Sequence, residues 1–149
     1  MVFKTAGLKP VPAPKYLHMM PEDSEIWTRF LKNADVVIDE VWYDVRVGQA
    51  VEVASGRPDW MRRWADYSTR KRIDVVARRG CDYWVIEVKP LAGMVALGQA
   101  IYYGEAFRKE YRPPRGVISA VVTDSVDQDV RSIFEQYGVV VFEVGGPEG

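Results

Sequence analysis

The sequence predicts an α/β fold with a single mixed sheet flanked by helices. Short runs of alternating apolar and polar residues indicate strands, and longer segments with apolar residues at helical spacing lie between them. In chain order the predicted elements read αβββαβαβ, an order typical of a layered domain built around one sheet. The 149 residues of the chain correspond to one domain, since domains usually have roughly 100–200 residues.

Composition excludes several classes of protein. Hydrophobic residues make up 48% and charged residues 28% of the chain, values typical of folded globular proteins rather than disordered or disulfide-stapled ones. No apolar run approaches the roughly 18 residues of a membrane span, and residues 1–20 lack the apolar core of a secretory signal. A cytoplasmic location is therefore expected. The single cysteine, Cys81, has neither a disulfide partner nor a metal-ligand spacing, so no zinc site is expected.

The charge of the chain is unevenly distributed. The formal net charge is −1, yet residues 57–79 carry eight Lys or Arg against three Asp, a local net charge of +5 (8 minus 3). A local excess of positive charge can bind a phosphate backbone even when the whole protein is nearly neutral. Overall charge therefore does not exclude a nucleic-acid partner.

Two segments precede the central part of the domain. The proline-rich residues 1–20 predict an extended arm, because proline neither continues a helix nor donates to a sheet. The domain itself spans 21–149. A helix is predicted from Pro21 to about Asn33, since proline and acids suit a first helical turn. Residues 36–47 alternate as a half-buried strand. Its inner face is predicted to hold Val37, Val41, Tyr43, Val45 and Val47.

A hairpin occupies the middle of the chain. Strands are predicted over 71–79 and 82–89, and Gly80-Cys81 supplies the turn between them. Pro90 is expected to end the second strand. The remaining predicted elements are a helix from 91 to 112, a buried strand over 116–123, a helix over 126–137 and a strand over 139–144.

The connection over residues 48–69 is long and contains a short predicted helix near 59–67. Aromatic and basic side chains cluster there and just after it, namely Trp60, Arg62, Arg63, Trp64, Tyr67, Arg70, Lys71 and Arg72. Such a cluster suits phosphate binding and stacking on unpaired bases. The alternative is a solvated charged face with both tryptophans in the core.

Charged residues interrupt both apolar strands of the hairpin. Alternation predicts that Asp74 shares one face of the first strand with Val76, and that Glu87 shares one face of the second strand with Lys89. A half-buried acid must be paired or bind a metal, and carboxylates suit Mg²⁺ or Mn²⁺. Lys89 is suited to orient or deprotonate a water. The pattern predicts metal-assisted phosphodiester hydrolysis; the alternative is an ion pair on a solvated face.

These residues resemble the motif of the PD-(D/E)xK nuclease superfamily, which includes many restriction enzymes, Holliday-junction resolvases and RecB-like exonucleases. The resemblance rests on Asp74 in RIDVVA and on Glu87 and Lys89 in WVIEVKP, with Ile73 in place of the motif's proline. It implies a restriction-endonuclease-like αβββαβ core with a further helix and strand. It also implies a deoxyribonuclease that binds Mg²⁺ or Mn²⁺ through Asp74, Glu87 and the Val88 carbonyl, with Lys89 serving the attacking water.

Two further features belong to this resemblance. In that family an acid of the first helix commonly completes the site; the helix face favours Glu22 or Asp23 over Glu25, and the family's usual glutamate favours Glu22. Gln99 and Tyr103, one helical turn apart, resemble the Gln-then-Tyr helix of RecB-like nucleases, which implies that they contact substrate or position the lysine. The alternative is an ordinary amphipathic helix packed on the sheet.

Together these observations predict a metal-dependent nuclease that acts on DNA. Nucleic-acid binding is assigned to Arg62, Arg63, Arg70, Lys71 and Arg72. No sequence-reading module is visible, so structure-selective or exonuclease-like action is expected rather than site-specific restriction. The alternatives are an inactive nucleic-acid-binding protein of the same fold and an endonuclease subunit of a larger complex. A homodimer is also possible, since cutting two strands favours a symmetric dimer.

Overall fold

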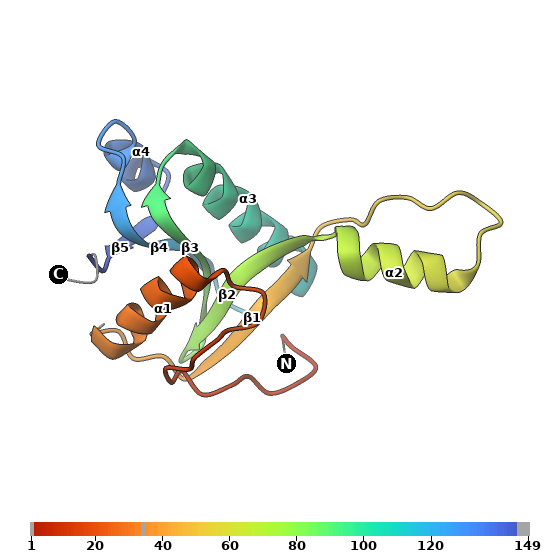
Figure 1. Ribbon diagram of the computed structural model, residues 1–149, viewed down its shortest axis with the longest axis horizontal. Coiled ribbons are helices and arrows are strands. Elements are labelled where there is room, and N and C mark those ends of the chain that lie inside the picture. Colours follow the sequence, from red (N-terminus) through yellow and green to blue (C-terminus); the bar gives the residue numbers. More distant parts are fainter. Residues whose placement is uncertain (1, 34, 146–149) are drawn as a thin grey trace.

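The computed structural model describes residues 2–33 and 35–145. Its elements, in chain order, are α1 (Pro21–Asn33), β1 (Glu40–Val47), α2 (Asp59–Thr69), β2 (Lys71–Arg79), β3 (Asp82–Ala92), α3 (Met94–Tyr111), β4 (Val117–Val126), α4 (Arg131–Gln136) and β5 (Val140–Glu143). Figure 1 shows one twisted sheet with helices packed against it. The predicted α/β class and single mixed sheet are confirmed.

The strands lie in the sheet in chain order, β1-β2-β3-β4-β5. The pairs β1–β2 and β2–β3 are antiparallel, whereas β3–β4 and β4–β5 are parallel. The parallel pairs need crossover connections, which α3 and α4 supply. The order of α1, β1 to β3, α3 and β4 is that of a restriction-endonuclease-like core, with α2 inserted between β1 and β2. In the part of the chain that the structure describes, no helix is long and apolar enough to cross a membrane.

Two faces of the sheet carry separate apolar cores. On one face, Ile26, Trp27 and Phe30 of α1 pack against inward residues of β1 to β4. On the other face, Tyr103 and Phe107 of α3 pack against β1 to β3. These helices fix the sheet from both sides, and β3 and β4 contact both of them.

Several predicted boundaries are wrong: β4 runs to Val126 rather than to residue 123, α3 begins at Met94 rather than at residue 91, and three further differences have a visible physical cause. β1 begins at Glu40 rather than at residue 36, and Val37, predicted on its inner face, is exposed. β3 continues past Pro90 to Ala92, because β2 pairs with β3 only as far as Ile86 and a proline is tolerated where a strand is open on one side. α4 is shorter than predicted, since residues 127–130 form a turn that precedes it.

The inward residues of β1 do not all lie on the same face of the sheet. Val41 and Tyr43 pack toward α1, whereas Val45 and Val47 belong to the cluster beneath α3. Between them Asp44 has a φ of 56°, a left-handed conformation that interrupts the alternation of a strand. The predicted common face for these valines is therefore wrong.

The N-terminal arm is extended, as predicted, and it packs on the domain. Leu8 exchanges two backbone hydrogen bonds with Val41, of 2.8 and 2.9 Å. Phe3 stacks on Trp42 with ring centroids 4.3 Å apart, and Tyr16 is buried in the core beside α1. The arm thus covers the outer edge of β1, an edge that would otherwise expose unpaired backbone groups.

The connection between β1 and β2 extends away from the sheet (Figure 1). This α2 projection, residues 48–69, contains the predicted short helix, and Ala65 is the buried residue of that helix. Trp60 and Trp64 are 59% and 64% exposed. The alternative that placed both tryptophans in the core is wrong.

Candidate active site

Asp74 and Glu87 face each other at the point where β2 and β3 separate. The backbone pairing of β2 with β3 ends at Val75 and Ile86, and Asp74 and Glu87 occupy the next positions beyond it. At these positions backbone N–H groups donate to carboxylate oxygens instead of to backbone carbonyls. The Val88 N–H donates to Asp74 Oδ2 at 2.9 Å, and the Asp74 N–H donates to Glu87 Oε1 at 3.5 Å. The hairpin therefore brings the two predicted acids together.

Alternation breaks at this opening, as it does in β1. Ile73 and Val76, three residues apart, belong to the same cluster beneath α3, and Val75 packs on the opposite face. The prediction that Asp74 simply shares a face with Val76 therefore misses a local change of direction in β2. The register of the hairpin places the two acids opposite each other, and beyond the last ladder pair their side chains accept the hydrogen bonds described above.

Glu87 is buried and Asp74 is half-buried. Glu87 is 2% exposed, and burial raises its pKa well above 4.5, with the neighbouring Asp74 raising it further. Burial also raises the pKa of Asp74, an effect opposed by the hydrogen bond from Val88. Within residues 2–33 and 35–145, no basic side chain forms an ion pair with either acid at 4.0 Å or less. An ion pair on a solvated face does not describe this arrangement.

Lys89 lies two residues beyond Glu87 and is half-buried. Its positive charge lowers the pKa values of Asp74, Glu87 and Asp23, which places the ammonium near all three acids without a direct ion pair. The lysine is thus held close to the carboxyl pair and keeps donors free for another group.

The acid that α1 contributes to this region is Asp23. Burial raises its pKa first and the charge of Asp74 raises it further, while Lys89 lowers it. Glu22 and Glu25 are exposed. The helix face left Glu22 and Asp23 open and the resemblance favoured Glu22; in the structure Asp23 is half-buried and its pKa is raised by burial and by Asp74, whereas Glu22 is exposed.

Tyr103 approaches the site from α3. It is buried, and desolvation followed by the charges of Glu87 and Asp74 raises its pKa to about 12. Its hydroxyl therefore keeps its proton and can donate. One turn earlier, Gln99 has a buried Oε1 with no hydrogen-bond partner among the described residues, so this acceptor is available to another group.

A further acid, Asp44, lies next to the pair and was not predicted. The register pairs Tyr43 with Val75 and Val45 with Ile73, so Asp44 lies opposite Asp74 across the two strands. Its side chain is 3% exposed, and its charge raises the pKa of Asp74. Strict alternation had placed it on the polar outer face of β1, which is why the sequence did not reveal it.

Three basic residues surround Asp44. Its oxygens lie 3.4 Å from His18 Nε2, 3.5 Å from Arg46 Nη2 and 3.7 Å from Arg72 Nη1. These come from the arm, β1 and β2, three segments that a hydrophobic pattern cannot align with one another. Asp44 therefore lies within ion-pair distance of two arginines, Arg46 and Arg72, next to the carboxyl pair.

The predicted nucleic-acid-binding residues have different surroundings. Arg70 braces the base of the α2 projection through Glu110 and a 2.8 Å hydrogen bond to the Gly48 carbonyl. Arg72 is held by Asp44. The other three, Arg62, Arg63 and Lys71, are exposed, and Arg62 is paired with a neighbouring aspartate on α2.

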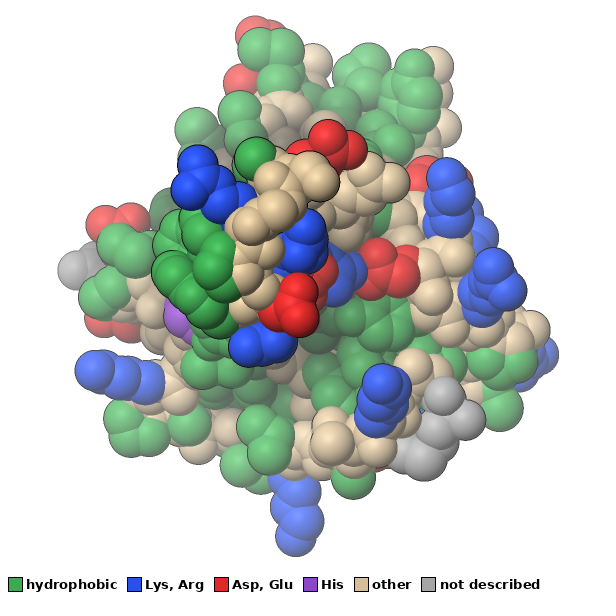
Figure 2. Space-filling model, turned by 90° about the vertical axis from the view of Figure 1, so that its right-hand side faces the viewer, with side chains coloured by type: hydrophobic (Ala, Val, Ile, Leu, Met, Phe, Trp, Pro, Cys, Tyr) green, Lys and Arg blue, Asp and Glu red, His purple; other side chains and the backbone are tan. Residues whose placement is uncertain are grey.

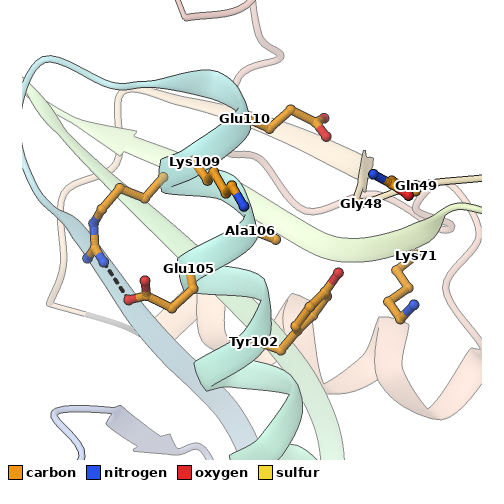
Figure 3. Close-up of a pocket in the computed structure, with 9 residues that line it drawn as sticks. Gly48, Gln49, Lys71, Tyr102, Glu105, Ala106, Lys109 and Glu110 are labelled. Atoms are coloured by element: carbon orange, nitrogen blue, oxygen red, sulfur yellow. Dashed lines mark hydrogen bonds and ion pairs between the residues drawn. The ribbon is translucent and has the colours of Figure 1, made fainter.

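A groove of about 970 Å³ lies between the end of β1 and α3. Figure 3 shows Lys71 on one side of it and Tyr102 on the other, with the Lys71 Nζ 5.6 Å from the centroid of the tyrosine ring. Glu105, which also lines it, pairs with Arg108 at 2.6 Å. Its lining mixes both signs of charge, so the groove presents no single electrostatic preference.

The chemistry of the carboxyl pair fits a hard divalent ion. Within the described ranges no group of three or more His, Cys, Asp or Glu is arranged to hold a metal. Mg²⁺ commonly binds through one or two carboxylates, with waters and substrate phosphate completing its shell. The half-buried Asp74 and the buried Glu87 supply two such carboxylates, and neither is ion-paired with a basic side chain of the described residues.

Few known proteins are similar to this chain in sequence or in structure by the comparisons that follow. No family model matches the chain, and no curated protein matches it. Among solved structures, the chain is similar to the crystal structure of a repair endonuclease from Pyrococcus abyssi, with a TM-score of 0.45 and 20% sequence identity. That similarity covers 51% of this chain and 34% of the other, about a third of its length. The case for a function rests on the site itself.

Proposed function

We propose that this chain is a divalent-metal-dependent nuclease that hydrolyses phosphodiester bonds of DNA. The observation that carries the proposal is the pair of the buried Glu87 and the half-buried Asp74, with Lys89 nearby and no basic side chain of the described residues ion-paired to either acid. A buried acid is costly unless it is paired or binds a metal. Carboxyl groups with strongly raised pKa values and a nearby charged partner are typical of functional sites.

Each residue has a defined role in this proposal. Asp74 and Glu87 hold Mg²⁺ or Mn²⁺, assisted by the carbonyl of Val88. The ion, when bound, polarises the scissile phosphate. Lys89 orients the attacking water and stabilises negative charge near it. Tyr103, whose hydroxyl keeps its proton, would serve as a hydrogen-bond donor to substrate near the carboxyl pair.

The fold supports structure-selective or exonuclease-like action over site-specific restriction. In the described part of the chain α1, α3 and α4 each pack on the sheet, and α2 is the helix that projects from it (Figure 1). The exposed side of α2 presents Trp60 and Trp64, whose rings stack on bases without reading their edges, beside Arg62 and Arg63, which can bind phosphate independently of sequence. Recognition of the shape or end of a substrate needs no reading of base edges.

The decisive experiment is cleavage of labelled DNA by the purified chain. Linear duplex, single-stranded and four-way-junction substrates are incubated with Mg²⁺, Mn²⁺ or EDTA, beside the variant Glu87→Ala. We expect metal-dependent cleavage of at least one substrate by the unaltered chain and none by the variant. DNA binding without cleavage of any substrate would favour the inactive nucleic-acid-binding alternative, and cleavage only with an added second protein would favour the subunit.

The three acids of α1 provide a matched test of the site. Asp23→Asn is expected to lower the cleavage rate by about 10–100-fold, the usual loss for a group that supports a metal ligand or its surroundings. Glu22→Gln and Glu25→Gln, on the same helix and exposed, should change the rate by no more than about twofold. Single-turnover rates at saturating Mg²⁺ distinguish these cases. A larger effect at Glu22 than at Asp23 would contradict the assignment.

A further inference from the structure

The α2 projection carries an aromatic face that is largely exposed. Trp60, Trp64 and Tyr67 follow one another at helical spacing and fall within about 60° of one another around the helix axis at 100° per residue. They are 59%, 64% and 57% exposed. The opposite side of α2 contains Ala65, the buried residue of the helix, so the two tryptophans lie on the side of the helix that faces away from its buried residue.

Charged side chains surround this face. On the projection the exposed Arg57, Arg62 and Arg63 are matched by the exposed acids Glu52, Asp59 and Asp66, and the excess of positive charge lies at its base, where Lys71 is exposed and Arg46 and Arg72 lie beside Tyr67. Figure 2, which looks onto the projection, shows apolar side chains gathered on one side of it with Lys, Arg, Asp and Glu side chains around them.

The aromatic face is tied to the candidate active site through two arginines. Arg46 stacks on Tyr67 with its guanidinium carbon 3.9 Å from the ring centroid, and its Nε donates to the Tyr67 carbonyl at 2.9 Å. Arg72 donates to the same carbonyl at 3.4 Å. Both arginines also pair with the buried Asp44, which lies opposite Asp74. The last turn of α2 is therefore fixed relative to the catalytic strand.

We propose that Trp60 and Trp64 form a stacking platform for the unpaired bases of single-stranded DNA, whose backbone then passes Arg46 and Arg72 toward Asp74. This inference rests on the proposed nuclease function and specifies its substrate. Aromatic side chains on a basic surface are the usual means of binding single strands, because every base has a face to stack. In a duplex the bases are already stacked on one another, so an exposed indole has only strand ends or unpaired segments to bind.

The test measures binding without cleavage. The full chain in EDTA is titrated into a fluorescein-labelled oligothymidylate of about 16 nucleotides, the upper end of the site sizes of single-strand-binding folds, and into a duplex of equal length. The double variant Trp60→Ala/Trp64→Ala is compared with Trp60→Phe/Trp64→Phe, which keeps stacking rings. Tyr137→Ala, an exposed aromatic residue after α4, is the matched control, and thermal unfolding verifies that each variant folds.

We expect the double alanine variant to bind the oligothymidylate at least about tenfold more weakly, since loss of one stacked base lowers affinity by about 5- to 150-fold. Duplex affinity, the phenylalanine variant and Tyr137→Ala should stay within about twofold. Equal losses on both substrates would overturn the proposal, as would unchanged single-strand affinity, including the case in which the alanine variant only abolishes a dimer.

The two proposals fail separately. If the unaltered chain cleaves nothing with Mg²⁺ or Mn²⁺ but shows tryptophan-dependent binding of single strands, the nuclease assignment fails and the platform stands. If the chain cleaves DNA while the double alanine variant binds single strands normally, the platform fails and the nuclease stands.

Discussion

Replacement of Lys89 by alanine is expected to lower metal-dependent DNA cleavage by about 10²–10⁴-fold, the usual contribution of a positioned acid or base, while leaving metal binding intact. Lys89 is half-buried, and its charge lowers the pKa of each nearby acid without an ion pair to Asp74 or Glu87. It is therefore placed to act on water or substrate rather than to hold the fold. Single-turnover cleavage and calorimetric titration with Mn²⁺ measure the two effects separately.

Glu87→Gln should lose both properties, because an amide lacks the charge that a divalent ion requires. Lys32→Ala, an exposed lysine in the last turn of α1, serves as the control for general loss of positive charge. Cleavage by Lys89→Ala within about twofold of the unaltered chain would remove Lys89 from the catalytic assignment. Loss of Mn²⁺ binding in that variant would instead make Lys89 part of the metal site's support.

The hairpin and its acids could be predicted because their signals are local. Gly80-Cys81 marks a turn between two apolar runs, and the spacing of Asp74 and Glu87 about that turn sets them opposite each other in a two-residue hairpin. The register that the structure shows is the same. What the sequence did not indicate is that the ladder ends one pair earlier, at Val75–Ile86, because separation of strands depends on what packs between them.

Asp44 and Asp23 illustrate the limit of pattern reasoning. Asp44 is buried because it has a left-handed backbone and basic partners from the arm and from β2, contacts between segments far apart in the chain. Asp23 rather than Glu22 meets the site because a one-residue step rotates a side chain by about 100° around a helix. The rotation of α1 about its axis determines which of the two acids lies near Asp74 and Lys89. That rotation depends on how α1 packs on the sheet, which is a tertiary property.

The tryptophans of α2 show the same limit for surfaces. A helix with apolar residues at i, i+4 and i+7 has an apolar face, but the spacing does not state whether another element covers it. Trp27 and Trp60 both lie on such faces; the first is fully buried and the second is exposed. Residues 48–58 lead away from the sheet, and this tertiary feature is what leaves Trp60 exposed while Trp27 is buried in the core.

Burial of the ionisable Glu87 is expected to destabilise the metal-free protein, so Glu87→Gln should raise the free energy of unfolding by about 1–3 kcal/mol at neutral pH, since each unit by which folding raises a pKa corresponds to about 1.4 kcal/mol. For a chain of this size each kcal/mol corresponds to about 2–4 °C in Tm. The neutral amide keeps the shape of the side chain without its charge. Stability and catalysis then conflict at one residue, as is common at active sites.

The sign of the pH dependence follows from the raised pKa of Glu87. Above pH 4.5, its ordinary value, the unfolded chain has released a proton that the folded protein still holds, so the free energy of unfolding falls as pH rises until the folded-state pKa is passed. The advantage of Glu87→Gln should be small near about pH 4 and should grow toward about pH 8. Denaturant unfolding in EDTA across that range measures it.

Glu52→Gln, an exposed glutamate in the α2 projection, is the matched control and should stay within about 0.5 kcal/mol at every pH. Added Mg²⁺ should reverse the order: at about 100 times its Kd it stabilises the unaltered chain by about 2.7 kcal/mol and leaves Glu87→Gln unchanged. A variant less stable than the unaltered chain in EDTA, or one equally stabilised by Mg²⁺, would show that the Glu87 carboxylate serves the fold rather than a metal ion.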